Sequence, residues 1–282
     1  MSLTKFLSLP SVKKKFAEEF PLPKADLTGE LKAPPISNHY SLVGTAFDYL
    51  LRAYIQRLNP ESITITYPLV AEDATFRALD NIRLFSILDK AFKKAEREYN
   101  SYLKSGKLDN EIMKSCLVLA QLDLVFRANY IDPNLGHVQK EDIQDLKNLI
   151  SIVNPDLFIA KKRVVLNPRF TSGYIVGGAD ADLIIDNTLI EIKTVKELKF
   201  KREYYDQLIG YYILKEIGGI YKLRKSTRIN RLGVYYSRHA ILQTIPISTI
   251  EDNPNFKKFI EWFKKEAINT YGEKVDTIWA AY

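Results

Sequence analysis

Cysteine is almost absent from this chain of 282 residues, which contains only Cys116. A single cysteine excludes an intrachain disulfide and a four-cysteine iron–sulfur cluster. It also fits a reducing compartment, so we expect a cytoplasmic protein. The sequence has no apolar run near the roughly 20 residues that span a bilayer. Its N-terminal segment is a poor secretory signal, because most of its lysines follow the apolar part. We therefore expect no membrane partner.

A phosphate-binding GxxxxGK[ST] loop is also missing, which excludes an ATP-driven motor within this sequence. A helicase, if the function needs one, would be a separate partner chain. The formal net charge is +7, and this suits a polyanionic partner such as nucleic acid, although many inert proteins are equally basic. Hydrophobic residues make up 46% and charged residues 27%, which is ordinary for a globular protein.

The stretch from Gly177 to Thr194 predicts a β-hairpin. Two runs rich in Ile and Leu alternate with polar residues, and the turn-forming pair Asp186-Asn187 separates them. If these two residues form the loop, Ile185 pairs with Thr188. The rest of the register then follows, because side chains alternate between the two faces of a strand.

In this register Asp182 faces Glu191 and Asp180 faces Lys193, and both pairs lie on one face of the hairpin. Two facing carboxylates repel each other, which gives a strand no benefit. A divalent cation between them removes this penalty. A neighbouring lysine can stabilise charge or position a water molecule. The hairpin therefore predicts a metal site.

Two motifs now resemble a known family. Asp182 followed by Glu191-Ile-Lys193 resembles the D…(D/E)xK signature of the PD-(D/E)xK nuclease superfamily. Gln207 and Tyr211, four residues apart on the next expected helix, resemble the QxxxY motif of its RecB-like exonuclease branch. Together the motifs cover about residues 163–245. The resemblance implies an α/β fold with a restriction-endonuclease-like core, which is a mixed central sheet flanked by helices.

The resemblance also implies roles for individual residues. Asp182, Glu191 and Lys193 would be catalytic, and Asp182, Glu191 and the Ile192 backbone carbonyl would bind Mg²⁺ or Mn²⁺. Gln207 and Tyr211 would hold DNA, with Tyr204 one helical turn earlier. The alternative is that the two tyrosines are core residues and Gln207 is incidental. Asp180 would pair with Lys193, tune it or serve as an extra ligand.

The third metal ligand is left open by the sequence. RecB-like nucleases place Gly-x-x-x-His early in an N-terminal helix, whereas this chain has Gly44 followed by Asp48 at the histidine position. An aspartate is an acceptable hard oxygen ligand. Asp48 is therefore either a ligand or an ordinary surface residue, and His39, five residues before Gly44, is a second candidate.

The expected organisation is an N-terminal arm, residues 1–40, followed by one nuclease domain, residues 41–282. A large helical insertion, residues 74–155, would be a scaffold or a wall of the substrate channel. Helical spacing of apolar residues predicts helices at Val12–Phe20, Ser41–Leu58 with Ser41 as its cap, Ala74–Ser105, Asp109–Asn129, Glu141–Val153, Phe200–Ile217 and Phe256–Tyr271. Strands are expected at Arg163–Leu166, Gly173–Val176, Leu232–Tyr236 and Ala240–Pro246, with His239 exposed in a turn and Trp279 as a packing anchor.

The leading interpretation is a metal-dependent nuclease that hydrolyses DNA phosphodiester bonds in an exonuclease-like manner. A restriction-type endonuclease would use the same residues. A second interpretation is a nucleic-acid-binding module that keeps the fold without cleaving. A third is a structural α/β protein in which the acidic pair is accidental.

Overall fold

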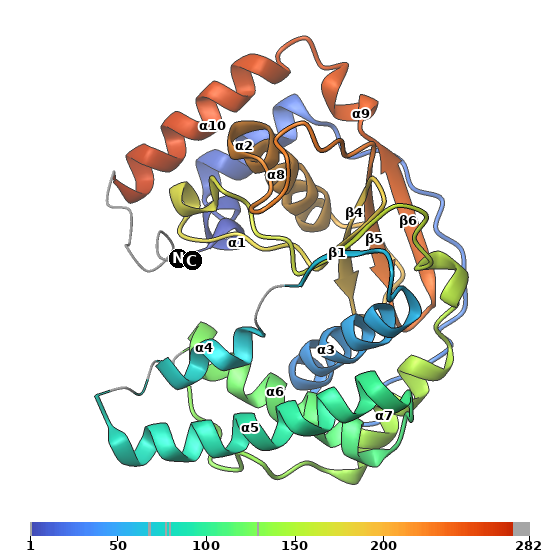
Figure 1. Cartoon of the computed structure of the whole chain (residues 1–282). Coiled ribbons are helices and arrows are strands. Elements are labelled where there is room, and N and C mark those ends of the chain that lie inside the picture. Colours follow the sequence, from blue (N-terminus) through green and yellow to red (C-terminus); the bar gives the residue numbers. More distant parts are fainter. Residues whose placement is uncertain (1, 67–68, 77, 79, 129, 273–282) are drawn as a thin grey trace.

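A computed structural model describes residues 2–66, 69–76, 78, 80–128 and 130–272, and Figure 1 shows how its elements are arranged. Trp279, the expected packing anchor, lies outside these residues. The described part of the chain is α/β, with one six-stranded sheet and helices against both of its faces. No helix within this part is long and apolar enough to cross a membrane.

The sheet follows the order of the chain. Its strands are β1 (Ile63–Thr66), β2 (Val164–Leu166), β3 (Leu183–Ile185), β4 (Thr188–Lys193), β5 (Arg231–Tyr236) and β6 (Ile241–Pro246). The pairs β1–β2 and β4–β5 are parallel and the other three are antiparallel, so the sheet is mixed. The strands predicted at Arg163–Leu166, Leu232–Tyr236 and Ala240–Pro246 are confirmed as β2, β5 and β6.

The two faces of the sheet are covered by two separate hydrophobic cores. Leu183 and Ile185 of β3 belong to the first core, whereas Ile184 between them belongs to the second. In β4, Leu189 lies on the same side as Ile184. This alternation follows from the two-residue period of a strand, and a sheet buried on both faces reads as a continuous apolar run.

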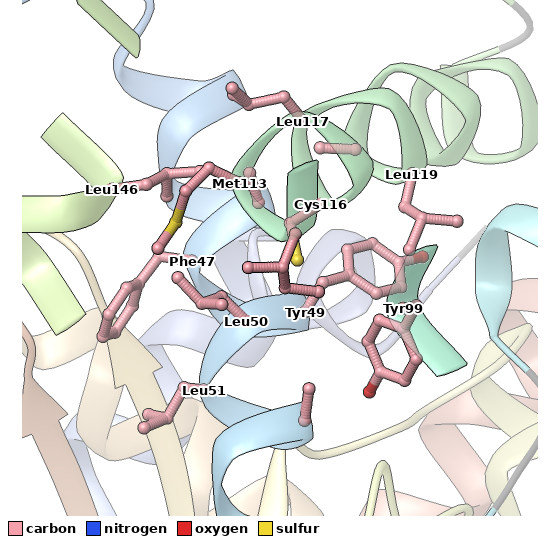
Figure 2. Packing of buried hydrophobic residues seen from close by; sticks show 14 of the residues in the cluster. Phe47, Tyr49, Leu50, Leu51, Tyr99, Met113, Cys116, Leu117, Leu119 and Leu146 are labelled. Atoms are coloured by element: carbon pink, nitrogen blue, oxygen red, sulfur yellow. The ribbon is translucent and has the colours of Figure 1, made fainter. Parts of the chain in front are cut away.

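The first core joins the sheet to the helices between β1 and β2 and to the helix before β1. These are α3 (Tyr40–Leu58), α4 (Val70–Phe76), α5 (Ile82–Ser105), α6 (Asn110–Ala128) and α7 (Lys140–Ser151). Figure 2 shows Met113 of α6 beside Phe47 of α3 and Leu146 of α7, and Cys116 of α6 beside Tyr49 of α3, all fully buried. Burying each such side chain contributes roughly 1.5–3 kcal/mol, so these helices form one stable layer.

The second core joins the opposite face to helices from both ends of the chain and to the helix between β4 and β5. They are α1 (Leu3–Leu7), α2 (Pro10–Glu19), α8 (Arg202–Gly218), α9 (Ser248–Glu251) and α10 (Phe256–Tyr271). Phe6 contacts Phe263 edge-on with ring centroids 5.1 Å apart, and Phe16 contacts Phe259 in the same way at 5.0 Å. The N-terminal helices therefore contribute to the core, and residues 21–39 contain no helix or strand.

Several expected elements differ in the structure. Gly173–Val176 is the 3₁₀ helix η2 and not a strand. Gly177 and Gly178 take φ values of 78° and 116°, which fold the chain back. The Gly178 amide therefore donates to the Gly173 carbonyl at 3.0 Å. The helix expected at Ala74–Ser105 is two helices, α4 and α5. Asn81 starts α5, where its side chain accepts a hydrogen bond from the Leu84 amide.

Two polar assignments near the sheet were also wrong. Ser41 lies inside α3, and the residue at its N-cap is His39, which makes no side-chain cap bond. His239 is not exposed: only 3% of it is accessible, and its ring nitrogens lie 2.9 Å from the Glu30 carbonyl and 3.0 Å from the Lys196 carbonyl. The irregular segment 21–39 passes over this turn and covers it.

Candidate active site

The hairpin has the register that the sequence predicts. Ile185 pairs with Thr188 and Leu183 with Ile190. Asp186 takes the left-handed conformation, φ 53°, that a two-residue hairpin loop requires. Its carboxylate also accepts backbone hydrogen bonds from Lys161 and Lys162, so the turn is fixed by the preceding segment of the chain.

Asp182 precedes the first residue of β3 and reaches across to β4. Its Oδ2 accepts a hydrogen bond of 2.6 Å from the backbone amide of Ile192. Glu191 is two residues after Leu189 on β4, so its side chain points to the same side of the sheet as that of Leu189. The structure brings the two carboxylates into one cavity, where Glu191 is only 6% exposed.

Lys193 completes a small network with Glu191 and helix α8. Its Nζ donates to Glu191 Oε1 at 2.9 Å and to Gln207 Oε1 at 3.0 Å. The Nζ atom also lies 5.1 Å from the ring centroid of Tyr204. The Tyr204 ring is therefore the third group, after Glu191 and Gln207, that holds the Lys193 side chain in place.

Asp180 does not face Lys193, which corrects the sequence-based pairing. The chain before Leu183 leaves β4 and pairs with the segment after β2: the Asn167 amide donates to the Asp182 carbonyl at 2.8 Å, and Arg169 forms a β-bridge with Asp180. The Asp180 carboxylate instead accepts from Arg127 Nη2 at 3.3 Å. The register rule fails here because the two-stranded ladder of β3 and β4 ends at Leu183.

Helix α8 holds Gln207 and Tyr211 against the hairpin. Gln207 Nε2 donates to Glu191 Oε1 at 2.9 Å and to the Tyr211 hydroxyl at 2.8 Å. The Tyr211 ring stacks on Phe170, with centroids 5.3 Å apart and an angle of 13° between the planes. Both residues are buried and line the cavity. Their observed contacts are with Glu191 and the core, and contact with DNA stays a prediction.

Asp48 enters the same cavity from α3, on the other side of the sheet. Its Oδ2 forms an ion pair with Arg52, one turn later on the helix. Its Oδ1 is buried and has no hydrogen-bond partner, and the same is true of Glu191 Oε2. His39 is placed elsewhere: its Nδ1 lies 3.0 Å from Asp142 Oδ2, and it does not line the cavity.

The cavity has a volume of about 660 Å³ and is lined by both helical layers and the hairpin. Five charged residues that sequence reasoning missed also line it: Lys5, Asp73, Asp123, Arg127 and Arg169. Asp123 is 3% exposed, and it accepts hydrogen bonds from the Tyr49 hydroxyl at 3.1 Å and from Arg127 Nε at 2.5 Å. An aspartate flanked by apolar residues in α6 was a signal that could have identified this residue.

Burial and neighbouring carboxylates raise the pKa of Asp182 and of Asp48. Burial raises the pKa of Asp182 well above its usual value, and the charges of Glu191 and Asp48 raise it further. Burial also raises the pKa of Asp48 to about 6, against the opposing effect of Arg52. Burial lowers the pKa of Lys193, but the Glu191 carboxylate outweighs this, so the pKa of Lys193 is raised overall. The lysine is therefore an ammonium ion beside crowded carboxylates.

The donor chemistry of Asp182, Glu191 and Asp48 fits a hard divalent cation. Two buried carboxylate oxygens lack partners, and mutual repulsion disfavours the ionised forms, so a cation in this cavity would satisfy both. Ile192, whose carbonyl was expected to be a ligand, also lines the cavity. Among the described residues, no three ligating side chains are already gathered closely enough to form a complete metal site.

The fold and the cavity together define an α/β protein with a recessed acidic site next to a lysine. Comparison with known protein families, curated proteins and solved structures finds no match to this chain. The function is therefore inferred from the residues of the cavity and from the layers that hold them.

Proposed function

We propose that this chain is a metal-dependent nuclease that hydrolyses phosphodiester bonds of DNA, with a restriction-endonuclease-like core. One observation carries the proposal: the unpartnered oxygens of Asp48 and Glu191 are buried in one cavity with Asp182 and Lys193. Buried carboxylate oxygens without partners cost free energy, which a functional cation site accounts for. The mixed sheet with helices on both faces is consistent with the proposed core.

In this proposal Asp182, Glu191 and Asp48 hold Mg²⁺ or Mn²⁺, with the Ile192 carbonyl as a further donor. When bound, such an ion supplies an acidified water molecule and positive charge beside the phosphate. Lys193 places its ammonium group where negative charge develops, since its bonds to Glu191 and Gln207 keep it protonated and oriented. Gln207 fixes the Glu191 carboxylate.

The recessed position of these groups favours action at strand ends over action within long duplexes. Glu191 is 6% and Gln207 9% exposed, so a phosphate reaches them only by entering the cavity. An end can be threaded into such a cavity more easily than an internal segment of a stiff duplex. We therefore propose an exonuclease, acting on DNA attracted by the net charge of +7.

The test is cleavage of plasmid DNA and of linear DNA labelled at either end, with Mg²⁺ or Mn²⁺. Glu191→Gln and Lys193→Ala are each expected to lower the rate on the order of 10²-fold or more. Glu197→Gln is the matched control, because its carboxylate is 72% exposed and lies outside the cavity. Cleavage that survives both active-site substitutions would refute the assignment, and activity on circular plasmid would indicate an endonuclease.

A further inference from the structure

An exposed aromatic ring lies at the rim of the cavity. Tyr40 is the first residue of α3, lines the cavity and is 45% exposed. Its hydroxyl accepts a hydrogen bond from Lys196 Nζ at 3.0 Å and donates one to Asn38 Oδ1 at 3.2 Å. The Lys196 ammonium also lies 4.6 Å from the ring centroid. These contacts hold the ring in place although nearly half of the residue is open to solvent.

Tyr40 lies on the same helix as the buried carboxylate of Asp48 but nearer the cavity entrance. Tyr40 and Asp48 are eight residues apart on one helix, which spans about 12 Å along its axis. Asp48 lies deep in the cavity, whereas Tyr40 and its neighbour Ser41 are exposed. Helix α3 therefore carries a proposed metal ligand at one depth and an aromatic ring nearer the solvent.

The rim is also rich in groups that suit a sugar–phosphate chain. Lys5, from the N-terminal helix on the opposite face of the sheet, and Ser41 both line the cavity and are exposed. Lys196 is exposed beside Tyr40. Lysine and hydroxyl side chains are ordinary phosphate contacts. Lys5, Ser41 and Lys196 thus add exposed donor groups for an anion to the buried Lys193 beside the carboxylates.

We propose that Tyr40, held by Lys196, is a stacking surface for an unpaired base of a DNA strand whose phosphate occupies the cavity. A fixed aromatic ring with a cation beside it is the usual means of holding single-stranded nucleic acid without reading its sequence. An unpaired base presents a free π face, whereas a base within a duplex is stacked on its neighbours. The inference rests on the proposed function for the identity of the ligand. Tyr40 is a positioning residue, because it acts on the strand and not on the scissile bond.

The experiment measures binding of a short labelled single-stranded oligonucleotide by fluorescence anisotropy in EDTA, which prevents cleavage. Tyr40→Ala and Tyr40→Leu remove the π face and are expected to raise Kd about tenfold, whereas Tyr40→Phe keeps the ring and restores most of the affinity. Tyr174→Ala is the matched control, because Tyr174 is 47% exposed and does not line the cavity. Thermal unfolding of each variant checks that the fold is intact.

A second oligonucleotide isolates the stacking contact. An abasic strand keeps the sugar–phosphate chain but has no bases, so Tyr40→Ala should have no further effect on its Kd. A Tyr40→Ala variant that binds the normal strand like the wild type would overturn the inference. The inference would also be overturned by a variant that loses the same affinity for the abasic strand.

The outcomes separate this inference from the proposed function. Suppose that no DNA is cleaved with either metal, while Tyr40→Ala weakens binding of the normal strand and leaves binding of the abasic strand unchanged. The stacking site then stands and the nuclease proposal fails. If DNA is cleaved and Tyr40→Ala binds and cleaves like the wild type, the nuclease proposal stands and the stacking site fails.

Discussion

Gln207 donates a hydrogen bond from Nε2 to Glu191 Oε1 at 2.9 Å, across sixteen residues of sequence. The bond ties helix α8 to strand β4 at the point where the proposed metal ligands meet. Gln207 Oε1 also accepts from Lys193 Nζ at 3.0 Å, so one amide orients both the carboxylate and the ammonium. The glutamine is thus positioned to organise the site itself, in addition to any contact with DNA.

Gln207→Met keeps the length of the side chain and removes its hydrogen bonds with Glu191, Lys193 and Tyr211. We expect kcat to fall roughly 30-fold with little change in KM, because the lost bonds to Glu191 and Lys193 are each worth about 1 kcal/mol in holding the reacting groups. Steady-state cleavage of labelled DNA measures both constants. Gln144→Met, an exposed substitution on α7, is the control. A higher KM with unchanged kcat would instead assign Gln207 to DNA binding.

Removal of metal should lower the stability of the protein without any substrate being present. A cation that binds only the folded state at 100 times its Kd contributes about 2.7 kcal/mol. For a chain of this size we therefore expect Mg²⁺ or Mn²⁺ to raise the unfolding midpoint by roughly 5–10 °C over EDTA. Differential scanning calorimetry of the wild type and of Glu191→Gln measures the effect. The shift should shrink in Glu191→Gln and persist in Glu197→Gln, and an equal shift in all three would place the metal elsewhere.

The ion pair between Arg238 and Asp145 should be the most sensitive polar contact of the fold. Both side chains are 1% exposed, and Arg238 Nη1 lies 2.8 Å from Asp145 Oδ1. Asp145→Asn leaves a buried guanidinium without its counter-charge, which we expect to cost about 3–5 kcal/mol. Urea denaturation measures the free energy of unfolding.

An exposed ion pair provides the comparison. Lys14 and Glu18 are 79% and 54% exposed with a 4.0 Å separation, so Glu18→Gln should change the free energy of unfolding by less than about 0.5 kcal/mol. Equal effects of Asp145→Asn and Glu18→Gln would contradict the structural role of the buried pair, which links α7 to the turn between β5 and β6.

Cys116 should not react with thiol reagents in the folded protein. It is fully buried among the side chains of Figure 2, and burial raises the pKa of its thiol far above the usual value. Because only the thiolate is nucleophilic, we expect labelling by iodoacetamide only on unfolding. Mass spectrometry across a urea gradient should give a labelling midpoint that coincides with global unfolding. Rapid labelling without denaturant would contradict the packing of α6.

Much of the β-core could be predicted from local pattern. The strands β2, β5 and β6 and the helices α8 and α10 follow from alternation or helical spacing of apolar residues. The strand expected at Gly173–Val176 was wrong. Its apolar residues suggested a strand, but Gly177 and Gly178 after it take backbone conformations that turn the chain. Local pattern identifies a buried segment, but here the glycines decided its shape.

The sequence by itself determined the hairpin and its register, because a two-residue turn and strict alternation leave Ile185 only one pairing, with Thr188. Only the tertiary structure decided which charges share the cavity. Asp180 pairs with Arg127 because the ladder of β3 ends early, and Asp48 lines the same cavity as Glu191 because α3 packs against the sheet. Such contacts join segments far apart in the chain, so they cannot be predicted from local periodicity.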